Sequence, residues 1–152
     1  MTEFYVKQTL FGAFKLGVEG NSVVYLKLTD EKQSSSFSTL AEQVFAQLDE
    51  YFKGERTAFD FPFKLAGTPF QLKVRNTLLN IPYGETRSYK EIACAAGNPK
   101  AVRAVGSACK NNPVWIAVPC HRVISSDGSL SGYAGGAEMK RQLLELEKGN
   151  SL

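Results

Sequence analysis

The 152-residue sequence predicts an α+β protein with a small sheet-and-helix half followed by a mainly helical half. Three observations support this fold class. Glycine-broken runs of β-branched and aromatic residues occupy residues 4–29, an apolar stripe with helical spacing covers residues 40–52, and helix-start signals recur from residue 68 onwards. With 43% hydrophobic residues, the chain has the composition of a globular protein and not of a disordered one.

The first half is predicted to be a small antiparallel sheet followed by one helix. The strand-like runs are separated by Gly12 and by the pair Gly20-Asn21, which is typical of short strands joined by tight turns. They lie at residues 4–10, 13–18 and 22–29. Apolar residues then recur every fourth position, at Leu40, Val44, Leu48 and Phe52, and Gly54 stands where a C-terminal cap is expected. An extended segment follows, so we expect domains at residues 1–65 and 66–152.

Two capping boxes indicate where helices begin in the second half. Thr68 and Gln71 frame the first, with a proline at the first helical position, and the helix is expected to end in the turn at residues 81–84. Ser88 and Glu91 frame the second, which starts a short helix that stops at Gly97. The next helix is expected to begin at Asn98-Pro99 and to run to about Lys110.

Two helices joined by a tight glycine turn predict a helix-turn-helix, although many helical hairpins bind nothing. The second helix carries small residues at Ala101, Ala104 and Gly106, with Arg103 as its one long cation in the middle. Such a helix can approach a nucleic-acid groove closely, and the arginine can enter the stack if a base leaves it. The alternative is that the alanines pack against the core and Arg103 is solvated.

Cys120 is followed by His121, the only histidine in the chain. A thiol beside an imidazole predicts a nucleophile with a lowered pKa, because the neighbouring base or cation favours the thiolate. The preceding apolar run, residues 114–118, predicts a strand that brings Cys120 to the edge of the core. The alternative is an inert buried thiol, which is the interpretation we give Cys94 and Cys109.

Glu147 lies at the edge of a predicted C-terminal helix whose apolar stripe contains Met139, Leu143 and Leu146. A carboxylate there needs a partner if it is buried. If His121 is that partner, the order Cys–His–Glu is a relay in which Glu147 orients the imidazole. The alternative is that Glu147 is solvated one turn from the helix end.

Composition narrows the remaining function classes. Residues 1–65 carry 7 basic and 9 acidic side chains, whereas residues 66–152 carry 11 and 6, so a phosphate-contacting surface is expected on the second half. The odd number of cysteines, without a CxxC pair, argues against a disulfide framework and against a metal site. No leader-like segment opens the sequence, and no apolar run approaches the ~20 residues of a membrane span, so we expect a cytoplasmic protein.

Residues 66–148 closely resemble the DNA-binding and acceptor domain of the 6-O-alkylguanine-DNA alkyltransferases, also called methylated-DNA–protein-cysteine methyltransferases. The motifs that carry the resemblance occur in the family's order and spacing: IPYGE, SY, GNPKAVRAVG, NP, PCHRV and GYAGG. In that context, PCHRV is highly specific. Residues 1–65 resemble the family's N-terminal domain, a ribonuclease-H-like α/β unit, only in size and element order.

The resemblance implies direct-reversal DNA repair, in which the alkyl group of 6-O-alkylguanine, and of 4-O-alkylthymine as a further substrate, passes irreversibly to Cys120. It implies that His121 is the general base, acting through water with Glu147 behind it, and that Asn112 links the helix-turn-helix to the active-site strand. The protein is consumed after one event. No cofactor, metal ion, membrane or obligatory protein partner is expected, and a monomer is expected to act on double-stranded DNA carrying alkylated guanine.

The resemblance also implies how the lesion is reached. Arg103 matches the finger that replaces the flipped nucleotide, and Tyr89 matches the tyrosine that crowds the adjacent phosphate and donates its hydroxyl to the base. The backbone at Val123 reads the guanine amino group, and the loop with Tyr133 and Ala134 walls the pocket. The remaining residues expected on the DNA-binding surface, which enters the minor groove, are Ser88, Ala101, Ala104 and Gly106.

Three positions depart from patterns common in that family, and they bear on the size of the pocket. Arg75 stands where tryptophan is frequent, Trp115 replaces a smaller residue or proline, and Ala134 occupies a site that is serine in some members. Two other function classes remain open: a non-catalytic lesion-binding module, against which the cysteine at position 120 argues, and a Cys–His hydrolase, which has no need of a minor-groove reader.

Overall fold

The computed structural model describes residues 1–130 and 132–150. The chain divides into two compact units, one formed by residues 1–65 with Pro113–Trp115 and the other by residues 66–112 with 116–152. Pro113–Trp115 belongs to the first unit although it stands in the sequence between two segments of the second. Among the described residues, no helix is long and apolar enough to cross a membrane.

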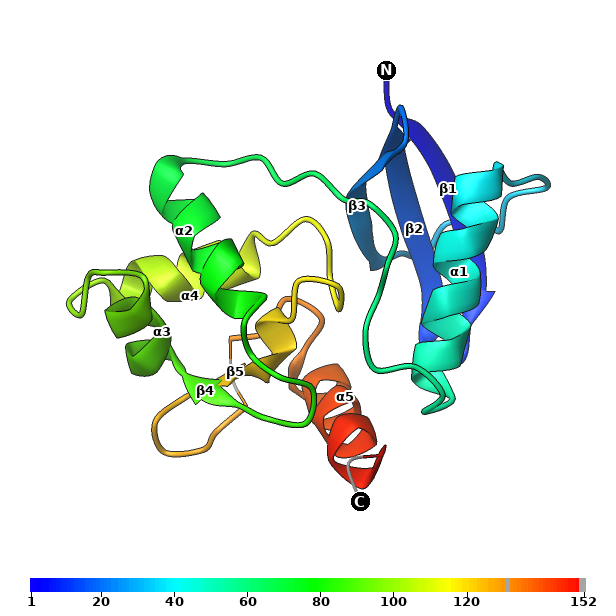
Figure 1. The fold of residues 1–152 in the computed structure, drawn as a ribbon. Helices are drawn as coiled ribbons and strands as arrows, with labels where there is room; N and C mark the ends of the chain where they lie inside the picture. Colours follow the sequence, from blue (N-terminus) through cyan, green and yellow to red (C-terminus); the bar gives the residue numbers. More distant parts are fainter. Residues whose placement is uncertain (131, 151–152) are drawn as a thin grey trace. The chain divides into compact units, whose positions relative to one another are not determined.

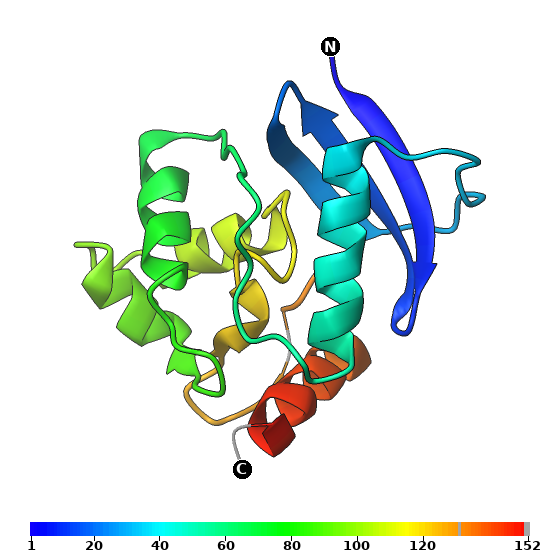
Figure 2. The ribbon, with the colours of Figure 1, turned by 45° about the vertical axis from the view of Figure 1, so that its right-hand side comes forward.

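The first unit is a three-stranded antiparallel sheet with one helix lying along it (Figures 1 and 2). The strands β1 (Glu3–Thr9), β2 (Gly12–Glu19) and β3 (Ser22–Leu28) are neighbours in that order, and the helix is α1 (Thr39–Phe52). The core between them is fully buried and aromatic-rich, with Phe14, Leu48 and Tyr51 among its members. Burial of each such side chain contributes roughly 1.5–3 kcal/mol.

The second unit is mainly helical. Its helices are α2 (Pro69–Leu78), α3 (Tyr89–Ala95), α4 (Val102–Lys110) and α5 (Ala137–Asn150), and the first three pack pairwise against one another. Two short strands, β4 (Arg87–Ser88) and β5 (Val123–Ile124), pair in parallel. Both predicted capping boxes are confirmed, at Thr68 with Gln71 and at Ser88 with Glu91.

One predicted helix start and one predicted strand are wrong. The helix α4 begins at Val102, not at Asn98-Pro99, because the Asn98 side chain accepts the backbone N–H of Lys100 and Ala101 N–H bonds to the Asn98 carbonyl, which makes a turn there. Residues 114–118 are not a continuous strand. Val114 forms an isolated bridge with Leu26, and Ile116 has φ = 72°, which a strand does not accommodate.

Candidate active site

Cys120 begins a single turn of 3-10 helix, Cys120–Arg122, between Pro119 and β5. The turn forms because the N–H of Arg122 bonds to the carbonyl of Pro119, which turns three consecutive side chains in different directions. All three side chains are buried. A thiol, an imidazole and a guanidinium are therefore held by one rigid turn in the interior of the second unit.

The thiol of Cys120 is 2% exposed and accepts a hydrogen bond from Asn112 Nδ2 at 3.3 Å. Asn112 is itself fully buried, and the same amide nitrogen donates to the carbonyl of Val118 at 3.0 Å. The burial raises the pKa of the Cys120 thiol to about 11, although the Asn112 hydrogen bond opposes this. The lowered thiol pKa expected from the adjacent histidine is therefore wrong for the resting protein, in which the thiol stays protonated near neutral pH.

His121 contacts a residue of α5 and not the thiol of Cys120. Its Nε2 lies 2.7 Å from Glu147 Oε2, and both side chains are fully buried. Within residues 1–130 and 132–150, no hydrogen bond joins His121 to the thiol of Cys120. The predicted contact between His121 and Glu147 is present, and the alternative of a solvated Glu147 is excluded by its burial.

Arg122 neutralises the buried carboxylate. Its Nε donates to Glu147 Oε1 at 2.8 Å, one terminal nitrogen donates to Oε2 at 2.9 Å, and the other donates to the carbonyl of Ile81 at 2.8 Å. The backbone N–H of Gly84 adds a longer bond of 3.4 Å to the same carboxylate. Glu147 is thus held on several sides, as a buried carboxylate must be.

These contacts fix the proton positions. Burial acts to raise the pKa of Glu147, but hydrogen bonds from His121 and Arg122 outweigh it and lower the pKa well below the usual range. An ionised carboxylate only accepts, so the ring nitrogen Nε2 must carry the hydrogen. Burial lowers the pKa of His121. The imidazole is therefore neutral, and its Nδ1, which has no hydrogen-bond partner among the described residues, is the basic nitrogen.

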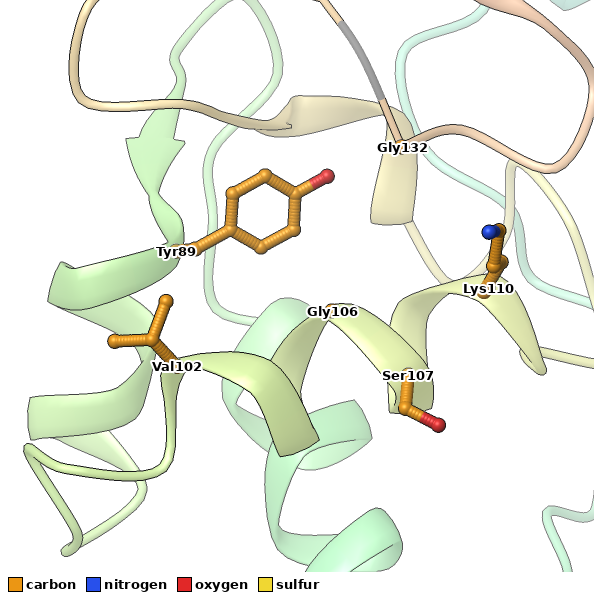
Figure 3. Close-up of a pocket in the computed structure, with 6 residues that line it drawn as sticks. All are labelled: Tyr89, Val102, Gly106, Ser107, Lys110 and Gly132. Atoms are coloured by element: carbon orange, nitrogen blue, oxygen red, sulfur yellow. The ribbon is translucent and has the colours of Figure 1, made fainter.

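A surface pocket of about 510 Å³ lies between α3, α4 and the segment at Gly132 (Figure 3). This is the size of a small-molecule site. Its described lining residues are Tyr89, Val102, Gly106, Ser107, Lys110 and Gly132. A Cβ on Gly132 would lie 2.9 Å from the Tyr89 hydroxyl, so a glycine there lets the backbone approach the ring closely. Gly106 has open space in front of it.

Tyr89 is the aromatic wall of that pocket. Burial raises its pKa to about 12, so its hydroxyl stays protonated at neutral pH. The ammonium of Lys140, from α5, lies 5.6 Å from the centre of the Tyr89 ring, and the Lys140 side chain is fully buried. A desolvated cation at this distance attracts the ring and holds its orientation.

Two family models match the chain. One describes the 6-O-methylguanine DNA methyltransferase DNA-binding domain and covers residues 69–149; the other describes the ribonuclease-like domain of the same proteins and covers residues 11–65. A Bacillus subtilis relative, the inducible methylated-DNA–protein-cysteine methyltransferase, is 45% identical over 151 residues, which span 95% of this chain and 84% of the relative. The chain belongs to the 6-O-methylguanine-DNA methyltransferase family.

Other members of the family agree with this assignment. A Mycobacterium bovis methylated-DNA–protein-cysteine methyltransferase is 60% identical over 102 residues, which are 67% of this chain and 62% of that protein, so the match spans less than two thirds of the relative. The crystal structure of the Mycobacterium tuberculosis protein in complex with DNA superposes with a TM-score of 0.89 at 43% identity, covering 97% of this chain and 93% of that one. The α+β fold class predicted from the sequence is confirmed.

The structure distributes the predicted site residues over two groups in the second unit. The first group lies at the 3-10 turn, where Asn112 contacts Cys120 and Glu147 contacts His121. The second group, Tyr89 and Gly106, lines the surface pocket. The remaining predicted residues differ in exposure. Arg103, Ala104 and Ala134 are exposed, and Val123 and Tyr133 are buried. Ser88 and Ala101 are of intermediate exposure; both stand at N-cap positions, of α3 and α4, but only the Ser88 side chain makes a capping hydrogen bond.

Sequence reasoning missed three buried cations near the site. In the sequence, Arg75 stands out only as a departure from the family pattern, and neither Arg122 nor Lys140 is assigned a role. Their exposures, in that order, are 2%, 8% and 0%. The adjacency of Arg122 to Cys120-His121 was the one available signal. A long side chain in an amphipathic helix, such as Arg75 or Lys140, looks the same in sequence whether it is solvated or buried. Among the described residues, no group of three or more His, Cys, Asp and Glu side chains could hold a metal ion.

Proposed function

We propose that this protein repairs DNA by transferring the alkyl group of 6-O-alkylguanine, in double-stranded DNA, to the sulfur of Cys120. The observation that carries the proposal is the pair of contacts at one 3-10 turn. Asn112 donates to the Cys120 sulfur, while the next residue, His121, bonds to Glu147. Family membership supports the reaction class, and the DNA complex of the M. tuberculosis relative supports the substrate. We extend the same chemistry to 4-O-alkylthymine.

The reaction is a displacement in which a sulfur–carbon bond forms as the carbon–oxygen bond breaks. The electron pair of the broken bond stays on the guanine. His121 Nδ1 takes up the thiol proton through water, and this proton is then passed on to the guanine. A neutral imidazole is needed for this step. Burial favours the neutral form by lowering the pKa of His121, and the hydrogen bond to Glu147 keeps the hydrogen on Nε2 and leaves Nδ1 free to accept a proton. Asn112 stabilises the developing thiolate by its hydrogen bond to sulfur.

The Tyr89 hydroxyl supports the leaving group. As a protonated donor in the pocket, it is suited to hydrogen-bond the guanine while negative charge accumulates there. The product at Cys120 is a thioether, which has no leaving group. Each chain therefore acts once, without a cofactor and without a resident metal ion.

We assign lesion access to α3 and α4 acting as a helix-turn-helix, within a DNA-binding and acceptor domain at residues 66–152. Small side chains at Ala101, Ala104 and Gly106 let α4 approach the minor groove, and the exposed Arg103 fills the space left by the flipped nucleotide. Ser88 contacts DNA at the start of α3. The backbone at Val123 and the loop with Tyr133 and Ala134 surround the extruded base. The protein acts as a monomer without an obligatory protein partner.

A titration tests this function. A duplex whose single 6-O-methylguanine blocks a restriction site is mixed with increasing amounts of protein, and the duplex made cleavable is counted. The proposal predicts a plateau of one repaired duplex per chain. Cys120→Ala should repair none while binding the duplex nearly as tightly, because the phosphate contacts that dominate affinity do not involve the thiol. Repair by Cys120→Ala, or several duplexes per chain, would refute the proposal.

A further inference from the structure

Arg75 is an interior arginine that bridges two carbonyls. It lies in α2 at 2% exposure, and its guanidinium donates from one terminal nitrogen to the carbonyl of Ala66 and from the other to the carbonyl of Asn111 at 3.1 Å. Gly67, with φ = 151°, makes room for it, because a Cβ there would fall 2.6 Å from the guanidinium. A planar fork with two parallel donors is suited to this bridging, whereas an ammonium is a single point.

One of the two bridged carbonyls stands next to the acceptor site. Asn111 is the C-cap residue of α4, where a cation also offsets the negative end of the helix dipole. The following residue is Asn112, whose N–H bonds to the Cys109 carbonyl at 3.2 Å and whose side chain donates to Cys120 Sγ. After Asn112 the chain leaves for Pro113–Trp115 in the other unit. The Arg75 bond therefore fixes the last peptide before the residue that holds the thiol.

We propose that Arg75 is a positioning residue for alkyl transfer, which holds the Asn112 amide against Cys120 Sγ by fixing the Asn111 carbonyl to that of Ala66. The inference rests on the proposed function of Cys120. It concerns this chain in particular, since tryptophan, which is frequent at this position in the family, cannot donate to two carbonyls. Arg75 touches neither substrate nor sulfur, and its contribution passes through Asn112.

A double-mutant comparison tests the inference. The single-turnover rate of alkyl transfer from free 6-O-benzylguanine is measured for wild type, Arg75→Met and Arg75→Lys, each also in an Asn112→Ala background. We expect both Arg75 variants to react about tenfold more slowly than wild type, or about 1.4 kcal/mol. In the Asn112→Ala background they should cause no further slowing, because the same interaction has already been removed. Lys73→Met, an exposed change on α2, is the control and should keep the wild-type rate.

Two outcomes overturn the inference. Wild-type rate in Arg75→Lys would show that only the positive charge matters, and multiplying losses in the Asn112→Ala background would show that Arg75 acts independently. If Arg75→Met does not fold, the comparison between Arg75→Lys and its Asn112→Ala counterpart decides the question alone. Failure of the wild-type protein to transfer a methyl group from 6-O-methylguanine in duplex DNA to Cys120 would instead refute the proposed function, which keeps the two failures distinguishable.

Discussion

Replacement of Glu147 by glutamine should destabilise the protein markedly while leaving it folded. The substitution keeps the size of the side chain and removes its charge. In the native structure, that carboxylate accepts two hydrogen bonds from Arg122 and one from His121 in a fully buried site. Glu147→Gln therefore leaves the guanidinium of Arg122 buried without its counter-charge.

The magnitude follows from the cost of breaking a buried ion pair by removing one partner, which is about 3–5 kcal/mol. The amide of the glutamine still accepts one hydrogen bond, so we expect the free energy of unfolding to decrease by the lower value, about 3 kcal/mol. For a chain of this length each kcal/mol lowers the melting temperature by about 2–4 °C, so we expect a decrease of about 10 °C. A domain with the usual 5–15 kcal/mol of stability survives this loss.

The measurement is thermal and denaturant unfolding of wild type, Glu147→Gln and the matched control Glu145→Gln. Glu145 lies on the same helix and forms an exposed ion pair with Arg141 at 2.6 Å, which is worth at most about 1 kcal/mol. Equal losses in the two variants would refute the reasoning.

The pH dependence gives a second check. The pKa of Glu147 is lowered in the folded state, so its contribution is present above the unfolded value of about 4.5 and is lost as the pH falls below it. The difference between wild type and Glu147→Gln should shrink from pH 5 to pH 3. A difference that stays constant over that range would contradict the assigned charge state.

Three further predictions concern the reaction. Arg103→Ala should slow repair of duplex DNA far more than reaction with free 6-O-benzylguanine, because only the duplex needs a base replaced in the stack; equal losses would assign Arg103 to the fold. Tyr89→Phe should repair faster than Tyr89→Ala in single-turnover assays, since it keeps the ring and loses only the hydroxyl donor; equal rates would show that the ring contributes nothing. Iodoacetamide labelling of Cys120, followed by peptide mass, should keep accelerating from pH 8 towards about 11, because burial keeps the thiol protonated below that pH; a plateau by pH 9 would contradict the raised pKa.

Local signals in the sequence predicted most of the fold. The strands of the first unit, α1 and both capping boxes depend on residues a few positions apart, so their patterns are visible without a structure. The start of α4 was predicted too early because Asn98 forms a competing turn, which the pair Asn98-Pro99 does not distinguish from a helix start. Residues 114–118 illustrate the ambiguity of a short apolar run, since periodicity cannot reveal the left-handed backbone at Ile116.

The site was predictable where neighbours in sequence are also neighbours in space. Cys120 and His121 are recognisable by their adjacency, and Glu147 by its place on a helical stripe. The charge of the buried Glu147, however, is compensated by Arg122, which lies 25 residues away in the sequence. The raised pKa of Cys120 followed from burial, which outweighs the adjacent imidazole because that imidazole faces Glu147. Arg75 and Lys140 are buried and contact residues far away in the sequence, Asn111 and Tyr89, and such long-range partners leave no local pattern.

Peptide mass mapping identifies the alkyl acceptor, which we propose to be the sulfur of Cys120. The protein is incubated with an excess of duplex DNA carrying 6-O-methylguanine, digested, and analysed for all three cysteines. We expect the peptide with Cys120 to become heavier by one methylene (~14 Da), in at most one equivalent per chain. An unmodified Cys120, or methyl groups on the exposed Cys94 or the buried Cys109, would contradict it.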